Sequence, residues 1–263
     1  MTANPDPPLL SEIARLFAQR ARQYCLTAAI VGVFGVIVIV AVALYILGGQ
    51  SPGQTDPLLL WKSMSEGQKF TTIFGLILAL WLPVLLGARA ACRITTAQLA
   101  NQELAFPAIV LDMLLFLPSA LVYALVIGLP VMMGSSCFFI PGLLIASLFT
   151  LIVPVSVNES LGIFPAVRRN FSLTGKVFGG LFLITFLCAV VIAGVIALRI
   201  VTIDHWLPAA GAASLALRYA IPYVPALLLM VLANVGFTLI YFAARRLETP
   251  LAYAAYPRGG SGS

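Results

Sequence analysis

The chain has few charged residues for its length. Only 9% of its 263 residues are charged and 61% are hydrophobic, whereas about 25% of the residues in a typical soluble domain are charged. Such an apolar composition does not suit a water-exposed domain, but it is typical of a chain embedded in a bilayer. The 15 basic residues outnumber the 9 acidic ones, yet they are too few and too dispersed to follow nucleic-acid phosphates. Nucleic acid is therefore not expected as a partner.

The sequence also lacks the residue clusters that enzymes and metal sites require. Its single histidine, His205, has one adjacent carboxylate, Asp204, whereas metal-dependent hydrolysis needs several carboxylates, usually with histidine. The chain contains no GxSxG motif, phosphate-binding loop or dinucleotide fingerprint. The four cysteines include no CxxC pair, which argues against zinc and a disulfide framework; they are Cys25, Cys92, Cys137 and Cys188. We therefore expect no catalytic residues, no metal and no cofactor.

Apolar runs of bilayer length are abundant. A transmembrane helix needs about 20 predominantly apolar residues. Six such segments fit the chain: 24–48, 70–90, two within 107–157, 177–200 and 220–243. Within 107–157 we expect the turn to lie between Pro130 and Pro141, because Gly134, Ser135 and Ser136 also interrupt the apolar pattern there. The sequence predicts an all-α fold, a polytopic membrane helix bundle with six transmembrane helices.

The distribution of basic residues predicts how these helices are oriented. If the N-terminus is cytoplasmic, 11 of the 15 basic residues lie inside, and Lys62, Lys69, Arg199 and Arg218 lie outside. The reverse orientation would break the positive-inside rule. The inside set comprises Arg15, Arg20, Arg22, Arg89, Arg93, Arg168, Arg169, Lys176, Arg245, Arg246 and Arg258. We predict a multi-pass protein of the bacterial cytoplasmic (inner) membrane with both termini in the cytoplasm.

The chain is expected to have three parts. Residues 1–23 should contain a cytoplasmic amphipathic helix, because Ile13, Leu16 and Phe17 share one helical face. Residues 24–248 should form a single six-helix transmembrane domain. Residues 249–263 end in RGGSGS and should form a flexible tail. Loops 49–69 and 201–218, on the outer side, are too short to be domains of their own.

A short internal repeat occurs on the predicted cytoplasmic side. The segment Phe106-Pro107-Ala108-Ile109 resembles Phe164-Pro165-Ala166-Val167 at an offset of 58, and an asparagine and a glutamate precede each copy. Proline in the first helical turn is typical of a helix start. We expect amphipathic interfacial helices before spans one, three and five, which makes three helix-plus-hairpin units. Chance similarity within an apolar chain is the alternative.

Residues 153–183 resemble the signature of the glycerophosphoryl diester phosphodiesterase membrane-domain superfamily and its uncharacterised bacterial relatives. The matching positions are Glu159, Ala166, Arg169, Leu173, Thr174 and Gly175, and Asn170 stands where the family usually has serine. The ending YFAARRLE at 241–248 is similar to the family's Tyr-x-x-x-Arg-x-x-Glu ending. The resemblance implies a six-helix polytopic fold. It implies no activity, because the membrane domain is not the catalytic part of such proteins.

Two kinds of polar residue are candidate site residues. Asp112 is the only acid within a predicted span, and Asn234 lies near the middle of the sixth; polar groups at membrane depth are costly and often functional. We favour an interfacial position for Asp112, because the repeat aligns it with Asn170. We expect Asn234 to bond to a neighbouring helix.

The basic residues Arg168, Arg169 and Lys176 either bind lipid phosphates or anchor the topology.

These observations favour a non-enzymatic membrane protein, a scaffold, accessory or lipid-contacting module in envelope or lipid metabolism. The alternative is a small transporter or channel for a lipid or small solute, which would need a mid-depth cavity lined by Asp112 and Asn234. Membrane lipids are the expected partners. The sequence leaves open whether a membrane-protein partner or a second copy also binds.

The orientation has a direct test. A membrane-impermeant reagent added outside intact cells should not modify reporter residues placed beside Arg93 or Arg169, because both lie on the predicted cytoplasmic side. The same reagent should modify a reporter beside Lys62 or Lys69. Labelling beside Arg93 or Arg169 from outside would overturn the six-span topology.

Overall fold

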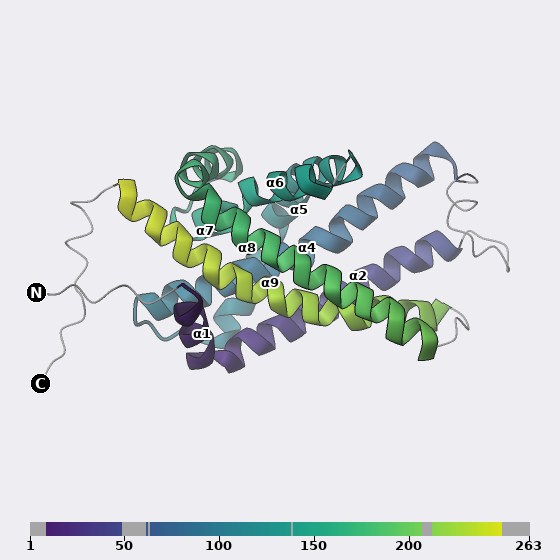
Figure 1. Ribbon diagram of the computed structural model, residues 1–263, viewed down its shortest axis with the longest axis horizontal. Coiled ribbons are helices and arrows are strands. Elements are labelled where there is room, and N and C mark those ends of the chain that lie inside the picture. Colours follow the sequence, from purple (N-terminus) through teal and green to yellow (C-terminus); the bar gives the residue numbers. More distant parts are fainter. Residues whose placement is uncertain (1–8, 49–61, 63, 138, 207–211, 249–263) are drawn as a thin grey trace, which may run out of the picture.

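The computed structural model describes residues 9–48, 62, 64–137, 139–206 and 212–248. These residues are helical apart from short turns and include no β-strand, which confirms the all-α prediction. The helices are α1 (Leu9–Gln19), α2 (Ala21–Gly48), α4 (Glu66–Leu99), α5 (Phe106–Cys137), α6 (Phe139–Phe149), α7 (Ile152–Asn158), α8 (Ile163–Trp206) and α9 (Ala212–Glu248). Figure 1 shows the longer helices running along one bundle, with α1 lying at one end.

Six helical segments in the described part of the chain are long and apolar enough to cross a membrane. They are Ala21–Val42, Glu66–Leu99, Phe106–Ser135, Phe139–Asn158, Ile163–Val195 and Leu228–Glu248. The fourth consists of α6 and α7, which meet at a turn at Thr150 and Leu151. These six helices confirm the predicted polytopic helix bundle.

The helices extend further than the apolar runs. The expected outer loop at 201–218 is instead helical up to Trp206 in α8 and again from Ala212 in α9. The prediction was wrong there because composition locates the apolar part of a helix, whereas helical backbone bonding continues readily into the headgroup region. At the start of α4, Ser65 and Gln68 form a reciprocal capping box. The tail at 249–263 and most of the loop at 49–69 lie outside the described residues.

Helix α9 connects the two apolar clusters of the bundle. Its residues Val231 and Val235 belong to a cluster with α1, α2, α4, α5 and α7. Its residues Phe237 and Ile240 belong to a second cluster, with α8 and the start of α7. Since a helix shared by two clusters contacts most of the others, α9 fixes the relative positions of α2, α4 and α8.

The two copies of the internal repeat have the same backbone turn. Two residues after α4 ends, Asn101 has a φ of 51°, and two residues after α7 ends, Ser160 has a φ of 48°. A left-handed residue after a helix end is a common way to stop the helix. The two turns are joined where Thr96 Oγ1 donates a hydrogen bond of 3.2 Å to Asn158 Oδ1. The repeat therefore corresponds to two matching helix–turn–helix connections that lie together.

Separate helical segments precede two of the three hairpins, at positions where interfacial helices are expected. Helix α1 buries Leu16 and packs Ile13 and Phe17 against the first apolar cluster, as its pattern predicts. In α8 the backbone leaves helical geometry at Val177 (φ −131°, ψ 17°), which divides a first part, 163–176, from the long span. Helix α5 differs, since it continues from Phe106 as one element. The two copies of the repeat thus form equivalent turns, but only α8 departs from helical geometry after its turn.

Close helix contacts at the far end of the α5–α6 hairpin require glycine. A Cβ atom at Gly142 would overlap Ser135 Oγ and lie 2.8 Å from the Ser135 backbone nitrogen. On the other side, a Cβ at Gly134 would lie 3.0 Å from the backbone nitrogen of Gly142. Because backbone atoms cannot move aside as flexible side chains can, α5 and α6 approach closely only with glycine here.

The substitution Gly142→Ala should destabilise the protein by about 1–3 kcal/mol, since it overpacks a backbone contact. The matched control Gly194→Ala places its Cβ in open space and should be neutral or stabilising by up to about 1 kcal/mol. The measurement is the unfolding midpoint of purified protein in detergent, followed by circular dichroism. Equal midpoints for the two variants would contradict the close α5–α6 contact.

Candidate functional site

Charged residues of α7, α8 and α9 meet where α9 ends. Arg169 Nε donates to Glu159 Oε2 at 3.0 Å, and Arg169 Nη1 donates to Glu248 Oε1 at 3.0 Å. A further hydrogen bond joins Arg169 Nη2 to Glu248 Oε2. The side chains are only 15–22% exposed. One guanidinium group therefore bridges two carboxylates in surroundings with little water, where charge-assisted bonds are strong.

Three more side chains complete this group. Lys176 Nζ lies 2.8 Å from Glu248 Oε1, and the Tyr241 hydroxyl donates to Glu159 Oε1 at 3.1 Å. Arg245 lies 3.6 Å from both carboxylates. We call the six residues the Glu159–Glu248 network: Glu159, Arg169, Lys176, Tyr241, Arg245 and Glu248. The spacing 241, 245 and 248 places three of them on one face of α9, which gives the Tyr-x-x-x-Arg-x-x-Glu pattern a physical role.

The three basic residues proposed to bind lipid are thus in different environments. Arg169 and Lys176 both form ion pairs with Glu248, so part of their charge is balanced within the protein, and Lys176 remains exposed. Arg168 is exposed, and within the described residues it forms no ion pair. Arg168 is therefore the member of the predicted set that has no carboxylate partner in the part of the chain that the structure describes.

Asp112 pairs with arginine across the α4–α5 contact. Its Oδ2 accepts a 2.7 Å bond from Arg89 Nε, and its Oδ1 accepts a 2.9 Å bond from Arg89 Nη2. Arg93 Nε lies 3.6 Å from the same carboxylate, and the Arg89 guanidinium lies 4.9 Å from the centre of the Phe116 ring. This bidentate pairing neutralises the Asp112 charge. It lies within two turns of the start of α5.

Asn234 is buried but bonds within its own helix. Its Nδ2 donates a 2.7 Å hydrogen bond to the Met230 carbonyl, one turn earlier in α9. The predicted bond to a neighbouring helix is therefore not the one formed, because a short amide side chain readily reaches the carbonyl four residues back. Like Asp112, Asn234 does not line the cavity described next.

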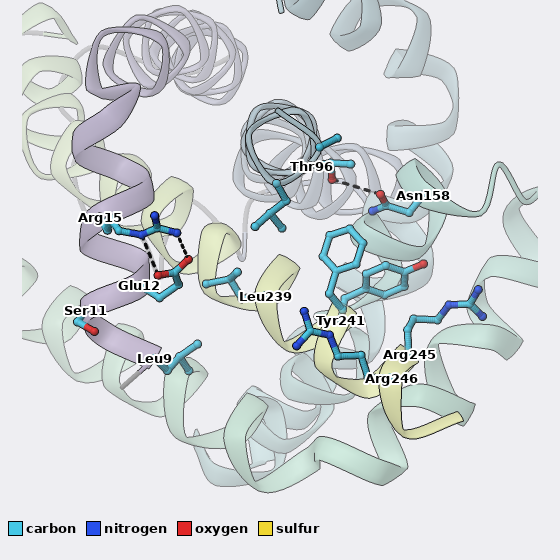
Figure 2. Close-up of a pocket in the computed structure, with 13 residues that line it drawn as sticks. Leu9, Ser11, Glu12, Arg15, Thr96, Asn158, Leu239, Tyr241, Arg245 and Arg246 are labelled. Carbon is cyan, nitrogen blue, oxygen red and sulfur yellow. Dashed lines mark hydrogen bonds and ion pairs between the residues drawn. The ribbon is translucent and has the colours of Figure 1, made fainter. Parts of the chain in front are cut away.

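An open cavity of about 1040 Å³ lies between α1, the end of α4 and the last turns of α9 (Figure 2). Figure 2 shows Glu12 and Arg15 on the α1 wall, joined by hydrogen bonds, and Thr96 and Asn158 at the opposite turns. The lining residues are Leu9, Ser11, Glu12, Arg15, Thr96, Leu99, Ala100, Asn158, Leu239, Tyr241, Phe242, Arg245 and Arg246. The cavity thus combines charged, polar and apolar surfaces.

The sequence did not single out this cavity. Arg15, Arg245 and Arg246 were recognised only as topology signals, because Arg15 is more than 200 residues away from the other two in the chain. The signal that points to the cavity is that all three lie on the same predicted side. Only the packing of α1 against α9 brings them together.

No protein-family model, no curated protein and no solved structure matches this chain. The resemblance to the phosphodiesterase membrane-domain superfamily therefore stays a prediction. Five of its matching positions belong to the Glu159–Glu248 network: Glu159, Arg169, Tyr241, Arg245 and Glu248.

Removing the bridging guanidinium should destabilise the protein. Breaking a buried ion pair costs about 3–5 kcal/mol and an exposed pair contributes about 1 kcal/mol or less. For the half-buried Arg169 we expect Arg169→Met to lower the free energy of unfolding by about 2 kcal/mol. The adjacent, exposed Arg168→Met is the matched control and should change it little. Equal effects in a denaturant titration would contradict a specific role for Arg169.

Proposed function

We propose that this chain is a non-enzymatic, lipid-contacting module of the bacterial inner membrane, a scaffold or accessory protein in envelope or lipid metabolism. Its supporting observation is a stripe of exposed side chains on the first part of α8. Phe164 is 82% exposed, and Arg168 and Phe171 are also exposed. We call these three residues the Phe164–Phe171 stripe.

The stripe has the chemistry of a membrane-surface contact. Its residues are spaced by four and three positions, so they share one helical face. The opposite face carries Ala166 and Asn170, both fully buried. An outward face with aromatic rings on either side of an arginine is typical of helices at the headgroup level, where rings enter the acyl boundary and the cation approaches phosphates.

The carboxylates at the same end of the bundle have a structural role, because they form ion pairs with other basic residues. Glu159 and Glu248 hold Arg169 and Lys176 in ion pairs, whereas the exposed Arg168 forms no ion pair within the described residues. The Phe164–Phe171 stripe belongs to the predicted cytoplasmic side. It would therefore face the leaflet whose anionic lipids attract basic residues.

The test is lipid enrichment around the full chain. The protein is equilibrated in vesicles of equal phosphatidylglycerol and phosphatidylcholine and gently extracted, and the retained lipids are quantified by mass spectrometry. A basic residue near an anionic surface contributes about 1 kcal/mol. We therefore expect Arg168→Gln to lower the phosphatidylglycerol enrichment about fivefold at the site it contacts.

Two further preparations complete this test. Arg22→Gln removes an exposed positive charge from a different helix and should leave most of the enrichment intact. Phe164→Ser should weaken retention of both lipids, because it removes the inserted ring. Unchanged retention in Arg168→Gln and Phe164→Ser would refute the lipid contact. Phosphodiester hydrolysis by reconstituted protein, lost when its own residues are substituted, would refute the non-enzymatic role.

A further inference from the structure

We propose that the connected ends of α4 and α5 hold the phosphate of an anionic phospholipid beside Arg89, Arg93 and Asp112. The site deepens the proposed lipid contact and rests on it in one respect, because it requires the chain to lie in a bilayer that contains anionic lipid. It lies on different helices from the Phe164–Phe171 stripe, which belongs to α8. The two contacts can therefore fail separately.

The charged group at this place has an excess of positive charge. Two guanidinium groups share one carboxylate, which leaves one net positive charge. Both oxygens of Asp112 already accept hydrogen bonds from Arg89, at 2.7 and 2.9 Å. Arg93 Nε lies 3.6 Å from Asp112 Oδ2, which is longer than a hydrogen bond. The single carboxylate therefore balances only part of the charge of the two arginines.

Arg93 is the part of this group that reaches the surface of the bundle. Its side chain is 44% exposed, against 17% for Arg89 and 16% for Asp112. Every other α4 residue between Trp81 and Gln98 is buried or half-buried. An arginine side chain has five N–H donors, and Arg93 donates none of them to an acceptor in the part of the chain that the structure describes. Where water is scarce, such donors need an acceptor from outside the chain.

The group lies near the depth of the phospholipid headgroups. Arg93 precedes Leu99, the last residue of α4, by six positions, and Asp112 follows Phe106, the first residue of α5, by six. At 1.5 Å per residue, both lie about 9 Å from the helix ends. The headgroup layer extends about 5–8 Å beyond the hydrocarbon core on each side. A long arginine side chain at this boundary reaches the lipid phosphates.

The α5 surface next to Asp112 suits acyl chains. Leu111, Leu114 and Leu115 are all exposed, and Leu115 is the most exposed of the three at 73%. Leu115 lies one turn further from the start of α5 than Asp112 does, toward the middle of the bilayer. A lipid whose phosphate meets Arg93 can lay its chains along this face. A free phosphate ion would leave these leucines without a partner, so the surface fits a lipid better than a soluble anion.

The experiment measures which lipid lies beside Leu115 when the full chain is in vesicles. A bimane fluorophore is attached at Leu115→Cys in a chain that also carries Cys25→Ser and Cys137→Ser, since the other two cysteines are buried. Phospholipids with brominated acyl chains quench bimane on contact. Titrating brominated phosphatidylglycerol against brominated phosphatidylcholine then gives their relative affinity for this surface. We expect the labelled chain to prefer phosphatidylglycerol.

Two substitutions should change this preference in opposite directions. Arg93→Gln removes the excess positive charge and should lower the preference about fivefold, the change expected from one basic residue near an anionic surface. Asp112→Asn removes the competing carboxylate and should raise the preference. Arg22→Gln removes an exposed charge from another helix and should leave the preference unchanged. Monodispersity and the unfolding midpoint show that each variant is folded.

The outcomes separate this site from the stripe on α8. Opposite changes in Arg93→Gln and Asp112→Asn, with the preference kept in Arg22→Gln, support the site. An absent preference at the Leu115 reporter overturns it, even where Arg168→Gln still lowers lipid retention. A lowered preference in Asp112→Asn, or an equal loss in Arg22→Gln, also overturns it.

A last arm distinguishes a lipid phosphate from a soluble one. Inorganic phosphate should lower the preference no more than sodium chloride of the same ionic strength does, because both act only by screening. A larger effect of inorganic phosphate would mean that a soluble anion occupies the site, and it would overturn the lipid as the ligand.

Discussion

Charged groups at the margin of hydrocarbon must find opposite charges nearby, because water is scarce there. Arg169 meets this requirement for two carboxylates at once, Glu159 at the end of α7 and Glu248 at the end of α9. The bond between α8 and α9 then fixes the end of α9, which packs in both apolar clusters. Fixing this end of α9 also fixes the turns beside it, where Thr96 meets Asn158.

The same balance of charge separates structural cations from available ones. The carboxylates of Asp112, Glu159 and Glu248 each hold an arginine in the bundle. Arg168 on α8 is directed outward instead, and Arg246 lines the cavity beside α1. Because an arginine bound by a carboxylate has little free charge for a phosphate, the proposed lipid contact depends on Arg168.

Much of the architecture follows from composition. The number of spanning helices, the amphipathic α1 with Leu16 inward, and the paired Phe-Pro turns at Phe106 and Phe164 were all predictable, because each depends on local pattern. The extent of α8 up to Trp206 was not, since hydropathy marks the hydrocarbon core rather than the helix end. The hydrogen-bond partner of Asn234 was also not predicted, because the distances from its side-chain amide to the possible acceptors cannot be read from residue spacing.

By itself, the sequence determined that this chain is a bundle of six membrane-length helices with most of its basic residues at one end. Long apolar runs and scarce charge admit no other stable arrangement in a bilayer. Only the tertiary structure decided which basic residues are paired with carboxylates and which are exposed. Arg168 and Arg169 are adjacent in the chain and have opposite roles, because the packing of α8 on α9 turns Arg169 toward Glu159 and Glu248 and leaves Arg168 outward.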